Sequence, residues 1–207
     1  MISQIRRFAV VSDINGNLPA LNSVLDDAKN RGINEFKLNR TGDKEKLMIE
    51  FRKFTDFPRG TMYDILCDAY SYDDRNKVIW DSSWKESDDF FYDHPDIADK
   101  YGLVTCLDGE PIGFVTWDPR NRPEYVEIGH NGIREQHKRQ GYGHMQLEEA
   151  LRRIKEYEGL KRIIVCTNNN LAAPKNYESV GFRLYDRKTN ETESAYTGDY
   201  LYYEIVL

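Results

Sequence analysis

The stretch Lys138-Arg139-Gln140-Gly141-Tyr142-Gly143 is a basic turn with two glycines, and the helical run 144–158 follows it directly. Backbone N–H groups at the start of a helix are ready to bind an anion such as a phosphate. The glycines remove side chains that would keep a pyrophosphate away from the main chain. The turn therefore predicts an anion site, and the segments around it indicate the fold that holds it.

The segments on both sides of this turn predict a mixed α/β sheet with helices on both faces. A strand is expected at 125–133, where Gly129 and Gly132 indicate a bulge or a close approach by other backbone. After the helix, the apolar run 162–166 suits the middle of a sheet. The other expected elements are strands at 47–54, 103–107, 112–117, 182–185 and 200–206, and helices at 62–72, from a capping box at 83–86, at 96–101 and at 172–180.

A second pattern follows the strand at 162–166 and begins at Asn170. The segment reads Asn-Leu-Ala-Ala-Pro-Lys-Asn-Tyr, ends at Tyr177 and is followed by Gly181-Phe182. With the glycine turn, it resembles the GNAT superfamily of N-acetyltransferases over residues 46–207. That family has Gln/Arg-x-x-Gly-x-Gly/Ala at its pyrophosphate turn and Asn-x-x-Ala-x-x-x-Tyr downstream. Lys138 departs from the first position, keeping the positive charge but losing the planar fork of Arg.

The resemblance implies a GNAT-like fold, which is a mixed, mostly antiparallel sheet with splayed central strands. It implies direct transfer of an acetyl group from acetyl-CoA to a primary amine, with no metal. The strand that ends at Ile133 would pair its backbone with the pantetheine amides. The residues that the resemblance assigns to acetyl-CoA are Ile133, Lys138, Arg139, Gln140, Gly141, Tyr142, Gly143, His144 and Asn170.

Two further residues are expected to act in catalysis. By resemblance Tyr177 lies near the sulfur of the co-substrate, and a tyrosine hydroxyl can protonate a departing thiolate. Glu127 is the first choice for the base because it lies on the strand before the glycine turn. His130, Glu124 or a chain of waters would also serve as the base. Each of these two residues also has an alternative role that stays open. Tyr177 would then only pack in the core, and Glu127 would be a solvated or structurally paired carboxylate.

The acceptor is expected to be a small-molecule or peptide amine that carries positive charge. Between residues 68 and 99 there are ten acidic and three basic residues, whereas 134–162 holds eight basic and five acidic ones. One part of the molecule thus suits an anionic ligand and another a cationic ligand. The acidic segment also holds an aromatic group expected partly to line the acceptor site, namely Trp80, Trp84, Phe90, Phe91 and Tyr92.

The composition excludes several other classes of protein. The net charge of −6 argues against a general nucleic-acid binder. No apolar run approaches the roughly 20 residues that a membrane span needs. Three cysteines far apart in the sequence favour free thiols in a reducing cytosol, so a cytoplasmic protein is expected. The sequence leaves a homodimer open.

The amino-terminal segment 1–36 is expected to be a strand, a turn and a helix, joined by a linker at 37–45. The run 8–11 reads as a buried strand, and a helical pattern ends at Gly32. Residues 1–35 resemble the start of calcineurin-like metallophosphoesterases, with Asn15 where a metal-binding histidine belongs. An amide is a poor substitute for imidazole as a ligand. An inactive fragment is therefore expected.

Two alternatives to an acetyltransferase stay open at this point. One is a non-catalytic module on the same fold that binds or senses CoA. The more remote one is a metal-dependent phosphoesterase directed by the amino-terminal segment.

Overall fold

The computed structural model describes residues 8–11, 35–38, 47–190 and 198–207. The chain divides into two compact units, residues 1–47 and 48–207. In the first unit, strand β1 (Phe8–Val11) pairs in parallel with strand β2 (Glu35–Leu38). Strand β1 lies where the sequence predicts it. The turn and the helix predicted to follow it lie outside the described residues.

Strand β2 is a correction to the predicted linker, because it includes Lys37 and Leu38. Four residues of mixed polarity carry little strand signal by themselves. The pairing with β1 supplies the hydrogen bonds that make them a strand. The rest of the predicted linker lies outside the described residues.

The second unit is built on a seven-stranded sheet with the order β3-β4-β5-β6-β7-β9-β8. Every neighbouring pair is antiparallel except β6 and β7, which are parallel. The strands are β3 (Ile49–Arg52), β4 (Gly102–Leu107), β5 (Glu110–Asp118), β6 (Val126–Ile133), β7 (Arg162–Asn168), β8 (Arg183–Lys188) and β9 (Tyr200–Val206). The predicted mixed, mostly antiparallel sheet is confirmed.

The central strands separate, as the predicted fold requires. Strand β6 pairs with β7 only at Val126–Ile163 and Glu127–Ile164. Beyond Glu127, β6 continues for six residues without a partner in β7. One side of β6 is therefore left open in the middle of the sheet.

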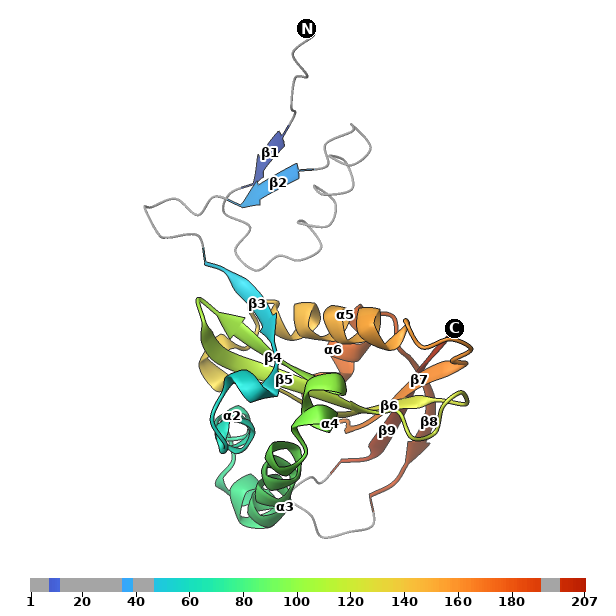
Figure 1. Ribbon diagram of the computed structural model, residues 1–207. Helices are drawn as coiled ribbons and strands as arrows, with labels where there is room; N and C mark the ends of the chain where they lie inside the picture. Colours follow the sequence, from blue (N-terminus) through green and yellow to red (C-terminus); the bar gives the residue numbers. More distant parts are fainter. Residues whose placement is uncertain (1–7, 12–34, 39–46, 191–197) are drawn as a thin grey trace, which may run out of the picture. The chain divides into compact units, whose positions relative to one another are not determined.

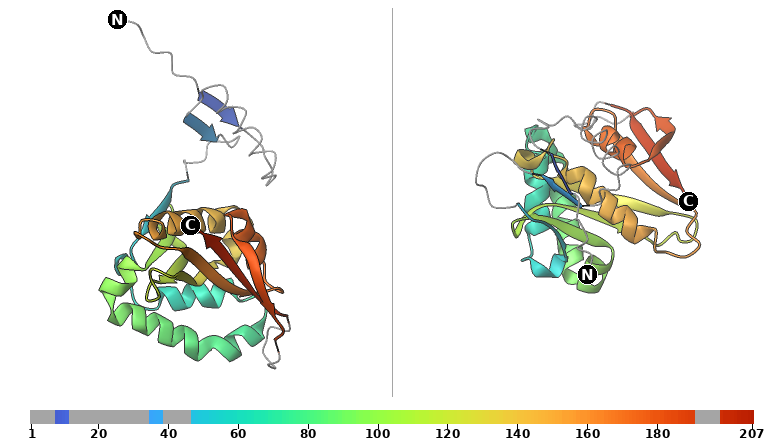
Figure 2. Two further views of the ribbon diagram at one scale, coloured as in Figure 1. Left: turned by 90° about the vertical axis from the view of Figure 1, so that its right-hand side faces the viewer. Right: turned by 90° about the horizontal axis from the view of Figure 1, so that it is seen from above.

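Helices cover both faces of this sheet (Figures 1 and 2). One face carries α5 (Tyr142–Ile154) and α6 (Ala173–Ser179), and the other carries α2 (Thr61–Ala69), α3 (Asp74–Asp93) and α4 (Pro95–Lys100). Short 3-10 helices lie at Phe54–Asp56 (η1) and Glu135–His137 (η2).

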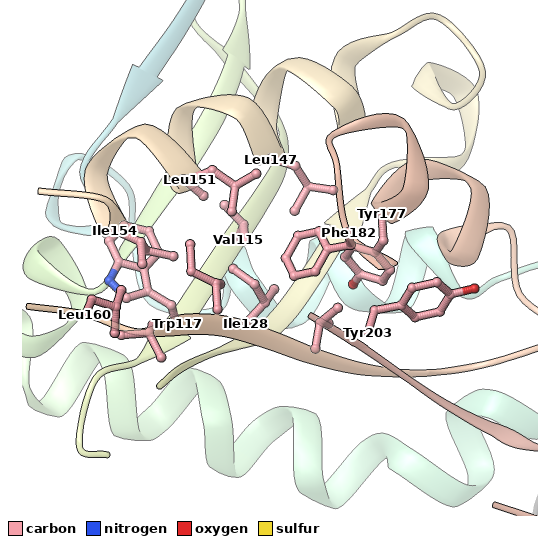
Figure 3. Packing of buried hydrophobic residues seen from close by; sticks show 14 of the residues in the cluster. Val115, Trp117, Ile128, Leu147, Leu151, Ile154, Leu160, Tyr177, Phe182 and Tyr203 are labelled. Atoms are coloured by element: carbon pink, nitrogen blue, oxygen red, sulfur yellow. The ribbon is translucent and has the colours of Figure 1, made fainter. Parts of the chain in front are cut away.

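The hydrophobic core beneath α5 follows from the spacing of its apolar residues. Leu147, Ala150, Leu151 and Ile154 recur at helical spacing and are all buried. Figure 3 shows Leu147, Leu151 and Ile154 in this core. Each fully buried leucine or isoleucine contributes about 1.5–3 kcal/mol relative to exposure. A second core beneath α2 and α3 includes Trp84.

Helix α3 begins nine residues before the predicted capping box at 83–86, which is a correction. Its N-cap is Asp73, whose carboxylate accepts a hydrogen bond from the Arg75 N–H at 3.0 Å. Aspartate is among the best N-cap residues, so the helix starts there and Ser83 lies inside it.

The first strand of this unit is also shorter than predicted, since Phe54 begins η1. Strands β4 and β5 are antiparallel neighbours joined by a two-residue turn, since Leu107 pairs with Glu110. Asp108 and Gly109 both have positive φ, 52° and 85°, which suits a tight turn between antiparallel strands.

Candidate active site

The open side of β6 exposes main-chain hydrogen-bonding groups. The Arg134 N–H donates to the Ile112 carbonyl at 2.8 Å. Hydrogen-bonded pairs alternate along antiparallel strands, so the N–H and C=O groups of Asn131 and Ile133 point away from β5. Because β7 has already separated there, these groups have no main-chain partner among the described residues and can pair with an extended ligand that carries amides.

A β-bulge sets the direction of the side chains on this part of β6. Gly129 and His130 together lie opposite Thr116, whose hydroxyl accepts a hydrogen bond from the His130 N–H at 3.0 Å. A Cβ on Gly129 would lie 2.7 Å from the Thr116 Oγ1 atom, so the bulge requires glycine. After the bulge, His130 faces α3 and Asn131 faces α5.

The glycine turn leaves the start of α5 open. Gly141 is the N-cap with φ of +90°, and within the described part of the chain no side chain caps the helix there. The N–H groups of the first turn are therefore available to an anion. Arg139 also has positive φ, 60°, and its exposed side chain has no partner within the described residues.

Other side chains of the turn have defined structural contacts. The Lys138 ammonium bonds to the Ala69 carbonyl and to Glu135, and it lies over the Tyr72 ring. Lys138 thus ties the turn to the end of α2. The contacts of the remaining predicted residues are Gln140 Nε2 to the Gln136 carbonyl, the Tyr142 ring against His137, and His144 with Ser179 and Glu148.

Gly143 and Asn170 both lie where α5 and α6 meet the ends of strands. A Cβ on Gly143 would lie 3.1 Å from Asn176 Nδ2, so this glycine lets α5 and α6 approach closely. Asn170 follows β7, and its N–H donates to the Asn168 carboxamide oxygen at 2.9 Å. Both residues therefore border the segment where β6 and β7 have separated.

Tyr177 is buried on the α5 side of the sheet and packs against Phe182 and Tyr203 (Figure 3). Its hydroxyl lies 3.4 Å from the Asn131 carboxamide nitrogen, which donates to it. Burial raises the pKa of Tyr177 to about 12, against the opposing effect of the Asn131 hydrogen bond. The hydroxyl is thus protonated at neutral pH and can donate a proton.

Glu127 lies on the opposite face of the sheet and is half-buried. It is the register partner of Asp118 across β5 and β6. Burial raises the pKa of Glu127, and the nearby Asp118 carboxylate raises it further. A carboxylate with a raised pKa is better matched to proton transfer near neutral pH.

The other two candidates for the base differ in their surroundings. The His130 Nε2 lies 3.2 Å from the Ser87 hydroxyl, and burial lowers the pKa of this imidazole. Because the Ser87 hydroxyl donates to the Ser83 carbonyl, its oxygen accepts from His130, which leaves Nδ1 unprotonated. Glu124 is exposed and paired with Lys161 at 2.6 Å, so it belongs to a surface ion pair.

A cavity of about 540 Å³ adjoins the bulge on the α3 and α4 face. Phe90 and Phe91 line it, together with Thr116, Asp118 and Gly129. Other members of the predicted aromatic group have different positions, since Trp84 lies within the core. The cavity offers apolar walls near the face that carries Glu127.

Many acidic residues of the segment 68–99 serve the structure. The buried Asp88 accepts the N–H groups of Gly60 and Tyr63 at the start of α2. Further carboxylates bond within the domain, namely Asp89 and Asp93 to Arg59, Asp81 to Lys85, and Asp99 to Thr55. These partners offset much of the local negative charge.

Three residues that hydrogen bonds connect to Tyr177 escaped the sequence analysis, namely Asn131, Gln146 and Thr105. Gln146 is fully buried and bonds to both of the others. A signal was present, because Gln146 is a polar residue on the apolar stripe of α5, beside Leu147.

The described residues give no sign of a metal centre, since no three His, Cys, Asp or Glu side chains among them could hold an ion. None of the helices in the described ranges has the length and apolar character that crossing a bilayer requires. The cysteines Cys67, Cys106 and Cys166 are free thiols, as predicted.

Comparisons with known proteins agree with this geometry. The model of the acetyltransferase (GNAT) family matches residues 60–182. A search of curated proteins gives no match. Similar solved structures include the ribosomal-protein-S18-alanine N-acetyltransferase of Escherichia coli, with a TM-score of 0.57 and 17% identity over 78% of this chain and 94% of that chain. An IAA acetyltransferase from Bacillus cereus has a TM-score of 0.52 and 18% identity over 78% and 100%. A Bacillus subtilis acetyltransferase in complex with CoA has a TM-score of 0.51 and 19% identity over 78% and 99%.

Proposed function

The chain belongs to the acetyltransferase (GNAT) family, and from this premise we propose that it transfers an acetyl group from acetyl-CoA directly to a primary amine. The observation that carries the proposal is the open side of β6 between the start of α5 and Tyr177. That arrangement offers a thioester three things, namely backbone pairing, an anion site and a proton donor.

The donor would bind along β6 and across the start of α5. The amides of pantetheine pair with the main-chain groups of Asn131 and Ile133, and the pyrophosphate accepts from the N–H groups of the α5 first turn. The exposed Arg139 adds positive charge there, while Lys138 holds the turn in place. The complex of the Bacillus subtilis relative with CoA supports this choice of ligand.

The ammonium form of the acceptor would first lose one proton to water, and the neutral amine nitrogen would then attack the thioester carbonyl carbon. A free main-chain N–H of β6 polarises the carbonyl and stabilises the oxyanion that forms. The base, Glu127 in the first place, accepts a proton from the nitrogen. The carbon–sulfur bond then breaks, and Tyr177 donates its proton to the departing thiolate. The products are an acetamide and CoA.

The acceptor would enter from the α3 and α4 face, where the cavity adjoins the bulge. Phe90 and Phe91 would contact an apolar part of the acceptor. Asp118 and Glu127, which are register partners on that face, favour an amine that arrives with positive charge. We therefore expect an acceptor with both an apolar body and a primary amine.

The test begins with binding of acetyl-CoA to the full-length protein by calorimetry. Saturable binding is expected, followed by release of CoA thiol when a panel of primary amines is added. Failure to bind acetyl-CoA at millimolar concentration would refute the proposal. Binding without release of CoA with any amine would favour a binding or sensing module.

The acceptor site has its own test. Phe91→Ala should raise KM for the amine several-fold and leave KM for acetyl-CoA unchanged. Tyr185→Ala is the matched control, because Tyr185 is an exposed aromatic residue on β8 that does not line the cavity. An equal effect of both substitutions would contradict the assigned site.

A further inference from the structure

A chain of polar side chains runs through the interior from β4 to Tyr177. The Thr105 hydroxyl bonds to Gln146 Oε1 at 2.7 Å, and Gln146 Nε2 bonds to Asn131 Oδ1 at 2.7 Å. Asn131 Nδ2 then reaches the Tyr177 hydroxyl at 3.4 Å. Side chains from two strands and two helices thus form one connected network.

A main-chain carbonyl fixes the direction of every bond in this chain. Gln146 Nε2 lies 2.8 Å from the Phe114 carbonyl oxygen, which can only accept a hydrogen bond. The nitrogen end of the Gln146 amide must therefore face Phe114. Its oxygen end faces Thr105, whose hydroxyl donates.

The same reasoning passes outward to Tyr177. Since Gln146 Nε2 donates to Asn131, the Asn131 oxygen faces Gln146 and the Asn131 nitrogen faces Tyr177. An amide NH2 group donates and does not accept. The Tyr177 oxygen is therefore the acceptor in this contact, and its own proton is directed elsewhere.

Burying the polar side chains of this network costs free energy that an apolar core would avoid. Gln146 is fully buried on a helix face whose neighbours are Leu147 and Ala150. Leucine would suit that face without any need for partners. A Cβ on Gly113 would also collide here, since it would lie 2.6 Å from the Gly132 carbonyl oxygen and 2.8 Å from Gln146 Oε1.

We propose that Asn131 and Gln146 are positioning residues that aim the Tyr177 proton at the departing thiolate, an inference that rests on the proposed acetyl transfer. Asn131 occupies the acceptor side of the phenol oxygen, so the proton is left for the substrate. When Tyr177 gives up that proton, the same Asn131 N–H stabilises the phenolate. The 3.4 Å separation is long for a hydrogen bond, and such contacts commonly shorten once substrates are bound.

A variant in which residue 131 accepts a hydrogen bond from Tyr177, and no longer donates one, tests the proposal. Asn131→Asp keeps the size of the side chain and still accepts from Gln146, but its carboxylate accepts the Tyr177 proton. We expect kcat to fall about 100-fold, within the range for loss of a general acid, while both KM values stay within about 3-fold. An unchanged kcat would overturn the proposal.

A double-mutant cycle separates positioning from a structural effect. In the Tyr177→Phe background, Asn131→Asp should cause little further loss of kcat, because its target is gone. If Asn131 serves only the structure, the same fold-change will appear in both backgrounds.

Two further variants test the inner part of the network. Gln146→Met fills a similar volume but releases the Asn131 amide to rotate, so kcat should fall about 10-fold. Thr105→Val is the matched control, since the Phe114 carbonyl still orients Gln146. Thr105→Val should lower the melting temperature and leave kcat nearly unchanged. Equal losses of kcat in both variants would contradict the proposed order of the chain.

A spectroscopic measurement keeps this inference separate from the proposed function. In protein labelled with ¹⁵N at asparagine, the Asn131 side-chain NH2 signals should be slow to exchange and should shift in Tyr177→Phe. Rapid exchange and no shift would overturn the proposed orientation, whether or not an acceptor is found. If the wild-type protein acetylates an amine but Asn131→Asp retains full kcat, the positioning role alone is refuted.

Discussion

Tyr177 and Glu127 lie on opposite faces of the sheet, and their environments suit opposite tasks. Tyr177 is buried among aromatic rings, where its pKa is raised to about 12, so it holds a proton to donate. Burial and the neighbouring Asp118 raise the pKa of Glu127 from the usual carboxylate range, which makes it a stronger base. A ligand bound between the separated parts of β6 and β7 would reach both faces of the sheet.

Removal of the Tyr177 hydroxyl should affect turnover and not binding. Tyr177→Phe should lower kcat on the order of 10²-fold, because the thiolate loses its proton donor, with acetyl-CoA affinity nearly unchanged. Tyr203→Phe is the control, since Tyr203 belongs to the same cluster but its hydroxyl donates to Glu178. Steady-state rates and calorimetry of both variants make the comparison, and equal kcat values would refute the assignment.

The pH dependence of turnover should report Glu127. Its carboxyl group must be ionised to act as a base, so kcat/KM should fall as the pH drops below its raised pKa. Asp118→Asn removes a negative charge that raises this pKa, so the acidic limb should move to lower pH. In Glu127→Gln the acidic limb of the kcat/KM profile that belongs to Glu127 should vanish. Only the titration of the acceptor amine should then remain. A limb that persists unchanged in Glu127→Gln would point to His130.

At the scale of elements, the start of α5 is distinguished by its N-cap residue. That residue is a glycine with a left-handed backbone and no side chain to accept from the first-turn N–H groups. Gly141 adopts φ of +90°, and a Cβ there would meet no atom of the described residues within 4 Å. A substitution would therefore act through backbone strain, not through a clash. The bulge at Gly129 is different, because there a Cβ would collide with Thr116.

Substitution of Gly141 should separate stability from binding. Gly141→Ala should cost about 1–2 kcal/mol of stability from the left-handed backbone and lower acetyl-CoA affinity as the turn shifts. Gly60→Ala is a close control, since Gly60 is the N-cap of α2 with φ of +96° and a Cβ there would meet no described atom within 4 Å. Thermal unfolding should show similar losses in both. A similar loss of affinity in Gly60→Ala would contradict the proposed pyrophosphate site.

At the scale of the whole molecule, the chain divides at residue 47 into two units with separate internal contacts. All residues proposed for acetyl transfer belong to the second unit. Its first strand begins just after Met48, whose N–H and C=O both bond to Asp108 at the β4–β5 turn. Met48 is therefore the natural start of an independent acetyltransferase unit.

A fragment of residues 48–207 should fold and bind acetyl-CoA as the full-length protein does. We expect Kd values within about 3-fold and a single cooperative unfolding transition. Circular dichroism and calorimetry of the fragment make the test. Loss of binding in a folded fragment would show that residues 1–47 contribute to the site.

The sequence by itself determined most of the elements and the family of the second unit. Strand β9 was predicted to the residue, and the turn at Asp108 and the apolar stripe of α5 reflect local turn chemistry and helical periodicity. These features depend on neighbours within a few residues, which is why they can be read from the chain. Where a local signal competed with another, as at Ser83 and Asp73, the stronger cap set the start of the helix.

The tertiary structure alone decided which side chains meet. The sequence does not state that β9 lies between β7 and β8, or that one extra residue at the bulge turns Asn131 towards α5. Asn131, Gln146 and Tyr177 are far apart along the chain, and their hydrogen bonds exist only after non-local strands and helices pack together. The direction of those bonds depends on the Phe114 carbonyl, a main-chain group that no sequence pattern encodes.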